Sequence, residues 1–218
     1  PGCKQGVKMS VIAQAGAKGR QLHKFGGSSL ADVKCYLRVA GIMAEYSQPD
    51  DMMVVSAAGS TTNQLISWLK LSQTDRLSAH QVQQALRRYQ SELISGLLPP
   101  DIADGLIGAF IHDLERLAGL LDSGVNDAVY AEVVGHGEVW SARLMSAVLN
   151  QQGLESAWLD ARDFLRAERG AQPQVDEGLS YPLLQQLLAQ HPGKRLVVTG
   201  FISRSNAGET VLLGRNGS

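Results

Sequence analysis

Apolar and polar positions at the start of the chain change from a short alternating run to a helical period. The segment "RQLHKF" (residues 20–25) partly alternates, which is typical of a strand, and it ends at Gly26-Gly27. In the next segment, "SSLADVKCYLRVAGIMAEYS", apolar residues recur at roughly helical spacing: Leu30, Val33, Leu37, Ala40, Ile42 and Ala44. We expect Ser28 or Ser29 to cap this helix through its hydroxyl.

The same pattern then repeats. The run "DMMVVSAAG" (residues 51–59) predicts a buried strand, and "TTNQLISWLKLS" predicts a helix that opens at Thr61 or Thr62. From residue 79 to residue 123 the pattern is helical almost throughout, with a break at Pro99-Pro100, so we expect a helical hairpin that covers a sheet.

The last third of the chain alternates helices with short strands. A helix is predicted from near Gly137 to Gly153, followed by a strand in "LESAWLDA" and by a helix in "YPLLQQLLAQ" with Pro182 in its first turn. Further strands are predicted in "KRLVVTGFIS" and "ETVLLGR". This alternation predicts an α/β fold, a three-layer α/β/α sandwich with a mostly parallel sheet between helices.

Composition narrows the classes of function. The chain has 218 residues, of which 44% are hydrophobic and 19% charged, with a formal net charge of -1. This composition lacks the excess of basic residues that is typical of nucleic-acid-binding proteins, so no nucleic acid is expected as a partner. No apolar run approaches the ~20 residues that span a bilayer, and no signal peptide is recognisable, so we expect a cytoplasmic protein without membrane contact.

Cysteine and histidine spacing gives no sign of a metal site. Cys3 and Cys35 are far apart, which favours neither a disulfide framework nor zinc, and Cys35 is expected in the core. The histidines lack H-E-x-x-H spacing and are expected to be solvated or packed: His23, His80, His112, His136 and His191.

Both ends of the sequence are unusual. Met9 would suit a natural start, so residues 1–8 are expected to be a cloning remnant or a disordered leader. The chain stops at "LLGRNGS", a strand and a glycine-rich turn of the kind that leads into a helix, so we expect a piece of a larger protein. An unpaired sheet edge there would favour a homo-oligomer.

The expected strand ends are rich in glycine and hydroxyl residues. They read "KFGGSS", "VVSAAGSTTN", "TGFIS" and "LLGRNGS", and ligands of open parallel sheets bind at such ends. Glycine turns let backbone N–H groups surround an anion, and Lys24 would add a full positive charge. A tight turn with an N-cap is the alternative for "GGSS", but Lys24 has no role in a cap. The P-loop motif is absent, and "GHGEVW" fails G-x-G-x-x-G at Trp140.

Four segments, "KFGGSSL", "VVSAAGSTTN", "GHGEVWSARL" and "TGFISRSNAGETVLLGRNGS", resemble in this order the aspartate kinases of the amino-acid-kinase fold. The resemblance extends from about Met9 onward and is closest to the kinase portion of bifunctional aspartokinase/homoserine dehydrogenases. It implies that residues 9–218 are the amino-acid-binding lobe, truncated before the nucleotide-binding half. Such a chain would by itself be inactive.

The resemblance also implies a reaction. Aspartate kinases transfer the γ-phosphoryl group of ATP, with Mg²⁺, to the side-chain carboxylate of L-aspartate, giving 4-phospho-L-aspartate on the way to lysine, methionine and threonine. Lys24 would be catalytic and face the transferring phosphoryl group, and NADP would belong only to a dehydrogenase region that this sequence does not contain. The implied phosphate-binding residues are Lys24, Gly26, Gly27, Ser28, Gly217 and Ser218.

For the amino acid, the resemblance implies that Glu138 accepts the α-ammonium group and that Arg215 binds the α-carboxylate. Ser56, Ala57, Thr62 and Phe201 would line the same pocket. Each residue has a structural alternative: Glu138 could complement a helix dipole, Thr62 could be an N-cap, Phe201 could be core, and Arg215 could be an exposed turn residue.

Two other functions stay open. The chain could be a non-catalytic amino-acid-binding or assembly module, or part of a sister kinase that acts on a glutamate derivative. A carbamate substrate is disfavoured, because it has neither an α-ammonium nor an α-carboxylate group for Glu138 and Arg215.

Overall fold

The computed structural model describes residues 19–170 and 172–214. Its main sheet has four parallel strands in the order β1 (Leu22–Phe25), β2 (Met52–Val55), β4 (Arg195–Thr199), β3 (Ser156–Leu159). The central strand β4 is buried along its whole length. Alternate residues of β1 and β2 are buried, since these two strands are less completely covered on one face.

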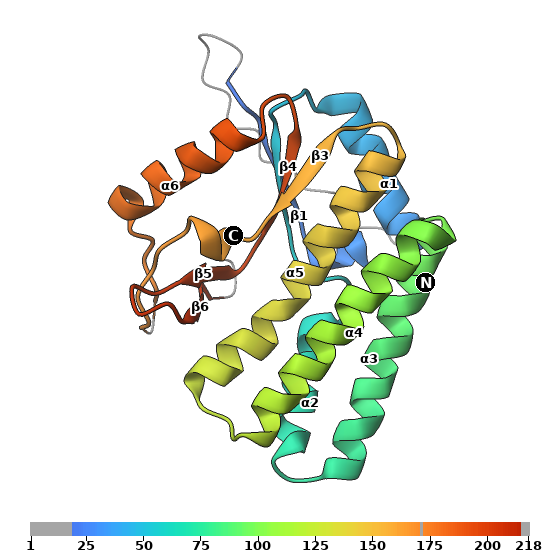
Figure 1. The fold of residues 1–218 in the computed structure, drawn as a ribbon, viewed down its shortest axis with the longest axis vertical. Coiled ribbons are helices and arrows are strands. Elements are labelled where there is room, and N and C mark those ends of the chain that lie inside the picture. Colours follow the sequence, from blue (N-terminus) through green and yellow to red (C-terminus); the bar gives the residue numbers. More distant parts are fainter. Residues whose placement is uncertain (1–18, 171, 215–218) are drawn as a thin grey trace.

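Helices cover both faces of this sheet, which confirms the predicted three-layer α/β architecture. Helices α1 (Val33–Tyr46) and α5 (Asp127–Gln151) lie on one side, and α6 (Glu177–Gln190) lies on the other (Figure 1). The side chains that join α6 to the sheet include Leu188, Leu196 and Val198. The larger cluster on the opposite face includes Tyr36, Met43, Met53, Val55 and Met145.

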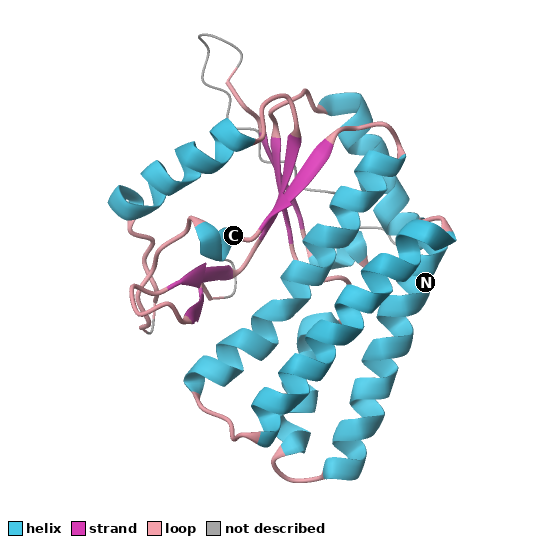
Figure 2. Ribbon diagram, in the orientation of Figure 1, coloured by secondary structure: helices cyan, strands magenta, loops and turns pink. Residues whose placement is uncertain are grey.

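The predicted helical hairpin exists, but it does not directly cover the sheet as expected. It consists of α3 (Arg76–Leu97) and α4 (Pro100–Asp122), which pack principally against α2 (Thr61–Ser72) and α5. In Figure 2 these helices form a bundle that extends beyond the end of the strands. Helix α5 supplies the reason, because it is long enough to contact both the strands of the sheet and α4 of the hairpin.

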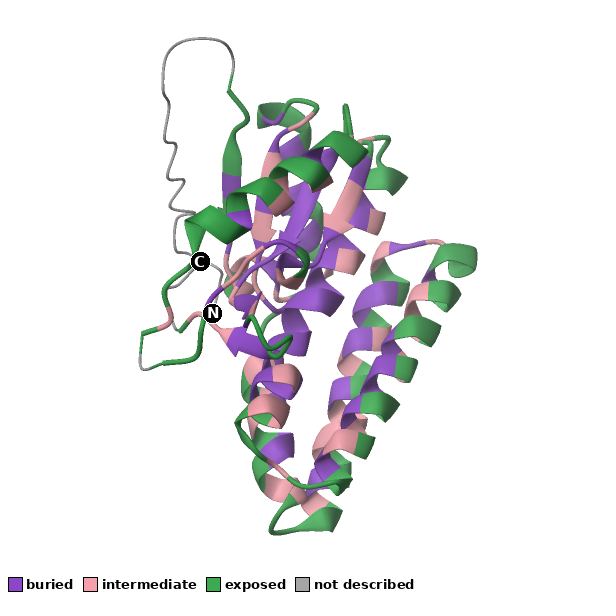
Figure 3. Cartoon of the chain, turned by 60° about the vertical axis from the view of Figure 1, so that its left-hand side comes forward, coloured by how far each residue is buried: buried purple, intermediate pink, exposed green. Residues whose placement is uncertain are grey.

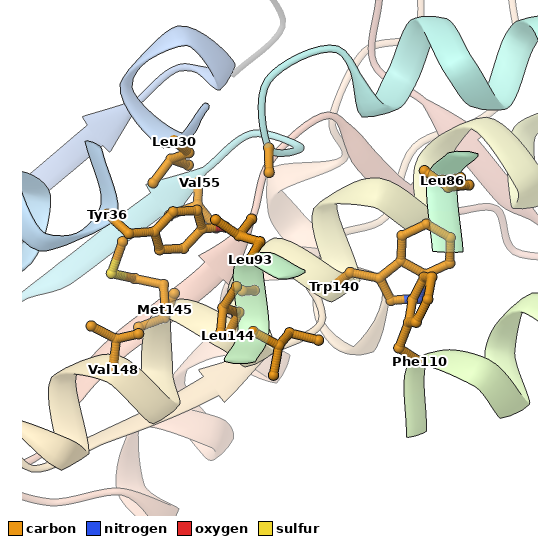
Figure 4. Close-up of a cluster of buried hydrophobic side chains, with 14 of the residues drawn as sticks. Leu30, Tyr36, Val55, Leu86, Leu93, Phe110, Trp140, Leu144, Met145 and Val148 are labelled. Atoms are coloured by element: carbon orange, nitrogen blue, oxygen red, sulfur yellow. The ribbon is translucent and has the colours of Figure 1, made fainter. Parts of the chain in front are cut away.

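The core is continuous from the sheet into this bundle. Figure 4 shows Trp140 of α5 against Phe110 of α4, and these rings meet edge to face with centroids 4.8 Å apart. Buried positions gather in the sheet and on the inner sides of the helices, whereas the outer helix surfaces are exposed (Figure 3). Cys35 is buried in the core, as expected.

The predicted starts of α5 and α1 were wrong. Helix α5 begins at Asp127 and not near Gly137, because the Asn126 side chain accepts a hydrogen bond from Val129 N (2.9 Å) and caps it there. Its end was correctly predicted, since Gly153 has φ +76° just past the last turn. Helix α1 is capped by Asp32 instead of Ser28 or Ser29.

The turn before α1 is itself helical. Residues Gly27–Leu30 form a short 3₁₀ helix, η1, which takes the place of the predicted serine cap. A second short 3₁₀ helix, η2 (Ala161–Asp163), follows β3. Helix α6 begins at Glu177 after an Asp176 cap, so Pro182 lies inside the helix and not in its first turn.

The segment predicted as one strand, "KRLVVTGFIS", is two. It breaks at Gly200 and Phe201, where Phe201 adopts φ +65°. Beyond the break, β5 (Ile202–Arg204) pairs antiparallel with β6 (Thr210–Leu212) in a separate two-stranded sheet. The chain thus leaves the main sheet at Gly200 and returns as a hairpin beside α5.

Candidate active site

Three turns meet where the parallel strands end. They follow β1, β2 and β4, and backbone hydrogen bonds join them: Ser56 N to Phe25 O (3.1 Å), Gly200 N to Val55 O (2.9 Å) and Gly59 N to Gly27 O (3.0 Å). Because β1 and β4 both pair with β2, their carboxyl ends lie at one edge of the sheet. The structure therefore brings three of the glycine-rich segments together.

The two glycines after β1 differ in what the fold requires of them. A Cβ on Gly27 would lie 2.7 Å from Ala57 O, so only glycine lets the turns after β1 and β2 approach this closely. A Cβ on Gly26 would have no neighbouring atom within 4 Å among residues 19–170 and 172–214, and the φ of Gly26 is -77°. Packing therefore explains Gly27, whereas no atom of the described residues requires glycine at position 26.

Lys24 and Ser28 lie beside these glycines. Lys24 is exposed on β1, an edge strand of the described sheet, and its register partner is Val54 of β2. Ser28 is exposed in η1. An ammonium group and a hydroxyl are thus carried by residues on either side of Gly26 in the sequence, and both kinds of group can bind phosphate oxygens.

Glu138 lies in the middle of α5 and is only 3% exposed. The N–H of Ala57 donates a hydrogen bond to Glu138 Oε1 (3.3 Å), while Oε2 is buried without a partner in the described part of the chain. Burial raises the pKa of this carboxyl group to about 8, despite the hydrogen bond from Ala57. A helix-dipole role, the structural alternative for Glu138, is wrong because the residue is far from the helix start.

Gly137 allows α5 to approach the turn after β2. A Cβ at this position would lie 2.8 Å from Ala57 Cβ and 3.0 Å from Thr61 Cγ2. The glycine before Glu138 therefore has a packing role that the sequence did not indicate. It lets the buried carboxylate reach the backbone of Ala57.

The other predicted pocket residues lie in or next to the same turns. Ser56 is half-buried, Ala57 is buried, and Thr62 is half-buried in the first turn of α2. Thr62 is not the N-cap, because that position belongs to Ser60. Phe201 is half-buried at the break after β4 and accepts a hydrogen bond from Leu213 N (2.8 Å). Arg215, Gly217 and Ser218 lie outside the described residues.

A network of charged residues beside the β5–β6 hairpin was not predicted. Glu132 Oε2 accepts hydrogen bonds from Arg162 (2.7 Å) and Thr210 Oγ1 (2.6 Å), and its Oε1 accepts one from Arg116 (2.9 Å). Arg162 also pairs with Asp160 (2.6 Å). Burial alone would raise the pKa of Glu132, but Arg162 and these hydrogen bonds lower it to about 2. The residues that bind Glu132 are far from it in the sequence, so no local pattern could have predicted this network.

In a second buried contact, His136 Nε2 lies 3.4 Å from Asp113 Oδ2. Arg143 also pairs with Asp113. Within residues 19–170 and 172–214, no group of three or more His, Cys, Asp or Glu side chains could hold a metal ion. No helix in those same ranges is long and apolar enough to cross a membrane.

Comparison with known proteins assigns the fold. Residues 19–218 match the model described as "Amino acid kinase family". The chain belongs to this family. It is 91% identical, over 96% of its length, to bifunctional aspartokinase/homoserine dehydrogenase 2 of Escherichia coli (strain K12). It is 30% identical, over 89% of its length, to lysine-sensitive aspartokinase 3 of the same organism.

Solved structures agree with this assignment. E. coli aspartokinase III in complex with aspartate and ADP superposes with a TM-score of 0.80 at 26% identity, over 90% of this chain and 44% of that chain. The same enzyme with lysine and aspartate gives a TM-score of 0.81. Our chain spans 26% of the bifunctional relative and 43% of aspartokinase 3.

Proposed function

We propose that this chain serves an aspartate kinase, which transfers the γ-phosphoryl group of ATP to the side-chain carboxylate of L-aspartate. The observation that carries the proposal is Glu138, a buried carboxyl group with an unused oxygen beside the joined turns of the sheet. An unpartnered buried carboxylate is costly unless a ligand pairs with it. The relatives named aspartokinase, and the solved complex with aspartate and ADP, support an amino-acid cation as that ligand.

The phosphate would bind on the other side of these turns. Lys24 would supply one cation, and the N–H groups of Gly26 and Gly27 with the hydroxyl of Ser28 would supply hydrogen-bond donors. Gly217 and Ser218 would complete this set. Mg²⁺ bound with ATP would neutralise further phosphate charge.

The reaction needs no general base. The aspartate side chain is already ionised at neutral pH, so one carboxylate oxygen attacks the γ-phosphorus while the bond to the bridging oxygen of ADP breaks. The products are 4-phospho-L-aspartate and ADP. The protein's task is to bring two anions together, and Lys24 is the residue proposed to reduce their repulsion.

The amino acid would be held by its two other charges. Glu138 would accept the α-ammonium group and Arg215 would bind the α-carboxylate, while Ser56, Ala57, Thr62 and Phe201 would line the pocket. Residues 9–218 would then be the amino-acid-binding lobe. An unpaired edge at β1 in the described sheet supports assembly with further chain or with a second copy.

Isothermal titration of the chain with L-aspartate tests the pocket. We expect heat of binding that disappears in Glu138→Ala and Arg215→Ala and persists in Glu115→Ala, an exposed residue of α4. Binding that survives both pocket substitutions would contradict the proposal.

Two further measurements separate the other candidate functions. Aspartate binding without formation of an acyl phosphate in the protein of full native length would favour a non-catalytic module. Stronger binding of a glutamate derivative than of aspartate would favour a sister kinase of this fold.

A further inference from the structure

Helix α3 presents two adjacent polar residues, Tyr89 and Gln90, to the turns of the candidate site. Tyr89 is half-buried and its hydroxyl donates a hydrogen bond to Ala31 O (3.0 Å). Ala31 is the C-cap residue that directly follows η1, the 3₁₀ turn after β1. This bond therefore fixes the far end of the turn that begins with Gly26 and Gly27.

The same hydroxyl lies where the two turns join. A Cβ on Gly59 would be 2.8 Å from Tyr89 Oη and 3.4 Å from Ala31 Cα, and Gly59 has φ +53°. The N–H of Gly59 in turn donates to Gly27 O (3.0 Å). The Tyr89 hydroxyl thus lies beside the backbone hydrogen bond that connects the turn after β2 to the glycine turn after β1.

Gln90 acts on the turn after β2 alone. Its side chain is only 3% exposed, and Nε2 donates to Thr61 Oγ1 (2.9 Å), which donates to Ala58 O (2.6 Å). Ala58 follows Ala57, whose N–H binds Glu138. A buried amide that only filled space would be less costly as an apolar side chain of the same size.

We propose that Tyr89 and Gln90 are positioning residues for the two substrates, and this inference rests on the proposed kinase function. Tyr89 sets the geometry of the turn that holds phosphate, and Gln90 sets the geometry of the turn that holds the amino acid. Neither side chain is assigned a contact with a substrate. Their effects on the two substrates should therefore separate.

Steady-state kinetics on the protein of full native length test this separation. We expect Tyr89→Phe to raise KM for ATP or lower kcat roughly 3- to 10-fold, the effect of one hydrogen bond, with KM for aspartate nearly unchanged. Gln90→Met should raise KM for aspartate by a similar factor and leave KM for ATP nearly unchanged. Tyr181→Phe and Gln81→Met, both at exposed positions, are the matched controls.

Equal changes in both KM values, or no change in either variant, would overturn the inference. If the unsubstituted protein has no aspartate kinase activity, the proposed function fails and amide hydrogen exchange in this chain decides the inference instead. Faster exchange of the Gly59 N–H in Tyr89→Phe, with the free energy of global unfolding unchanged, would support positioning. Unchanged exchange at Gly59 would overturn it.

Discussion

The backbone N–H of Ala57 donates a hydrogen bond to Glu138 Oε1 at 3.3 Å, across a sequence separation of 81 residues. This contact joins the turn after β2 to the centre of α5, and Gly137 makes the approach possible. It satisfies only one of the two carboxylate oxygens, because Oε2 is buried without a partner among the described residues. The contact therefore both fixes the turn and leaves an acceptor for a ligand.

The raised pKa of Glu138 should make the protein less stable as pH rises. The folded protein keeps this proton up to a pKa of about 8, whereas the unfolded chain releases it near 4.5, so unfolding becomes easier between these values. The slope from this group is roughly 1.4 kcal/mol per pH unit. We expect Glu138→Gln to remove this loss, so that the variant gains stability relative to the unsubstituted protein from pH 4.5 to 8.

Urea unfolding at several pH values measures this difference. Glu115→Gln, at an exposed position of α4, is the control and should follow the unsubstituted protein at every pH. A constant difference between Glu138→Gln and the unsubstituted protein across this range would mean that the carboxyl group is not protonated in the fold.

Aspartate binding should release a proton. Glu138 is protonated below its pKa of about 8 and must ionise to accept the α-ammonium group, so affinity should fall as pH decreases from 8. Titration calorimetry in two buffers of different ionisation enthalpy measures the protons released per aspartate bound. A value near zero at pH 7 would contradict the assignment of Glu138 to the ammonium group.

Replacing Gly137 should damage the candidate site through packing. In Gly137→Ala the new methyl group would lie 2.8 Å from Ala57 Cβ, so α5 and the turn must separate. We expect a loss of ~1–3 kcal/mol in stability and weaker aspartate binding.

A second glycine of the bundle provides the control for this substitution. Gly108 is exposed in α4, and a Cβ there would have no neighbour within 4 Å in the part of the chain that the structure describes. Gly108→Ala should therefore stabilise the protein by roughly 0.5–1 kcal/mol through the higher helix propensity of alanine. Thermal unfolding of both variants tests the pair, and equal stabilisation by each would contradict the close approach of α5.

The network around Glu132 should hold the β5–β6 hairpin to α5. Glu132→Gln removes the charge that pairs with Arg162 and should cost roughly 1–3 kcal/mol at neutral pH, because the ion pair is partly buried. Because the folded pKa of Glu132 is about 2 and the unfolded value near 4.5, this contribution is present above pH 4.5 and is lost as pH falls toward 2.

An exposed ion pair that involves a residue of the same hairpin is the matched control. Glu209 lies 3.3 Å from Arg169, and both side chains are more than a third solvent-accessible, so Glu209→Gln should have little effect. Denaturant unfolding of the two variants at neutral and acidic pH measures the contrast. Similar losses for both would show that the Glu132 network contributes no more than a surface pair.

The sequence by itself predicted the layers of the fold and proposed candidate site residues. Alternating and helical apolar periods predicted β1, β2, β3 and the helices between them, because burial on one face imposes these periods locally. Glycine turns at strand ends and a neighbouring charge also indicated Lys24 and Gly26 as candidates, whereas Glu138 became a candidate only through the resemblance to aspartate kinases. The segment from Gly200 was misjudged, because its apolar run does not reveal the backbone break at Phe201.

Only the tertiary structure decided which of these segments and residues contact one another. The unused oxygen of Glu138, the requirement for glycine at positions 27 and 137, the Glu132 network, and the reach of Tyr89 and Gln90 all depend on segments that lie far apart in the sequence. Local patterns encode periodicity and turn chemistry. Burial of a charge and a close approach of two backbones arise only when distant segments pack together, so only the folded chain determines them.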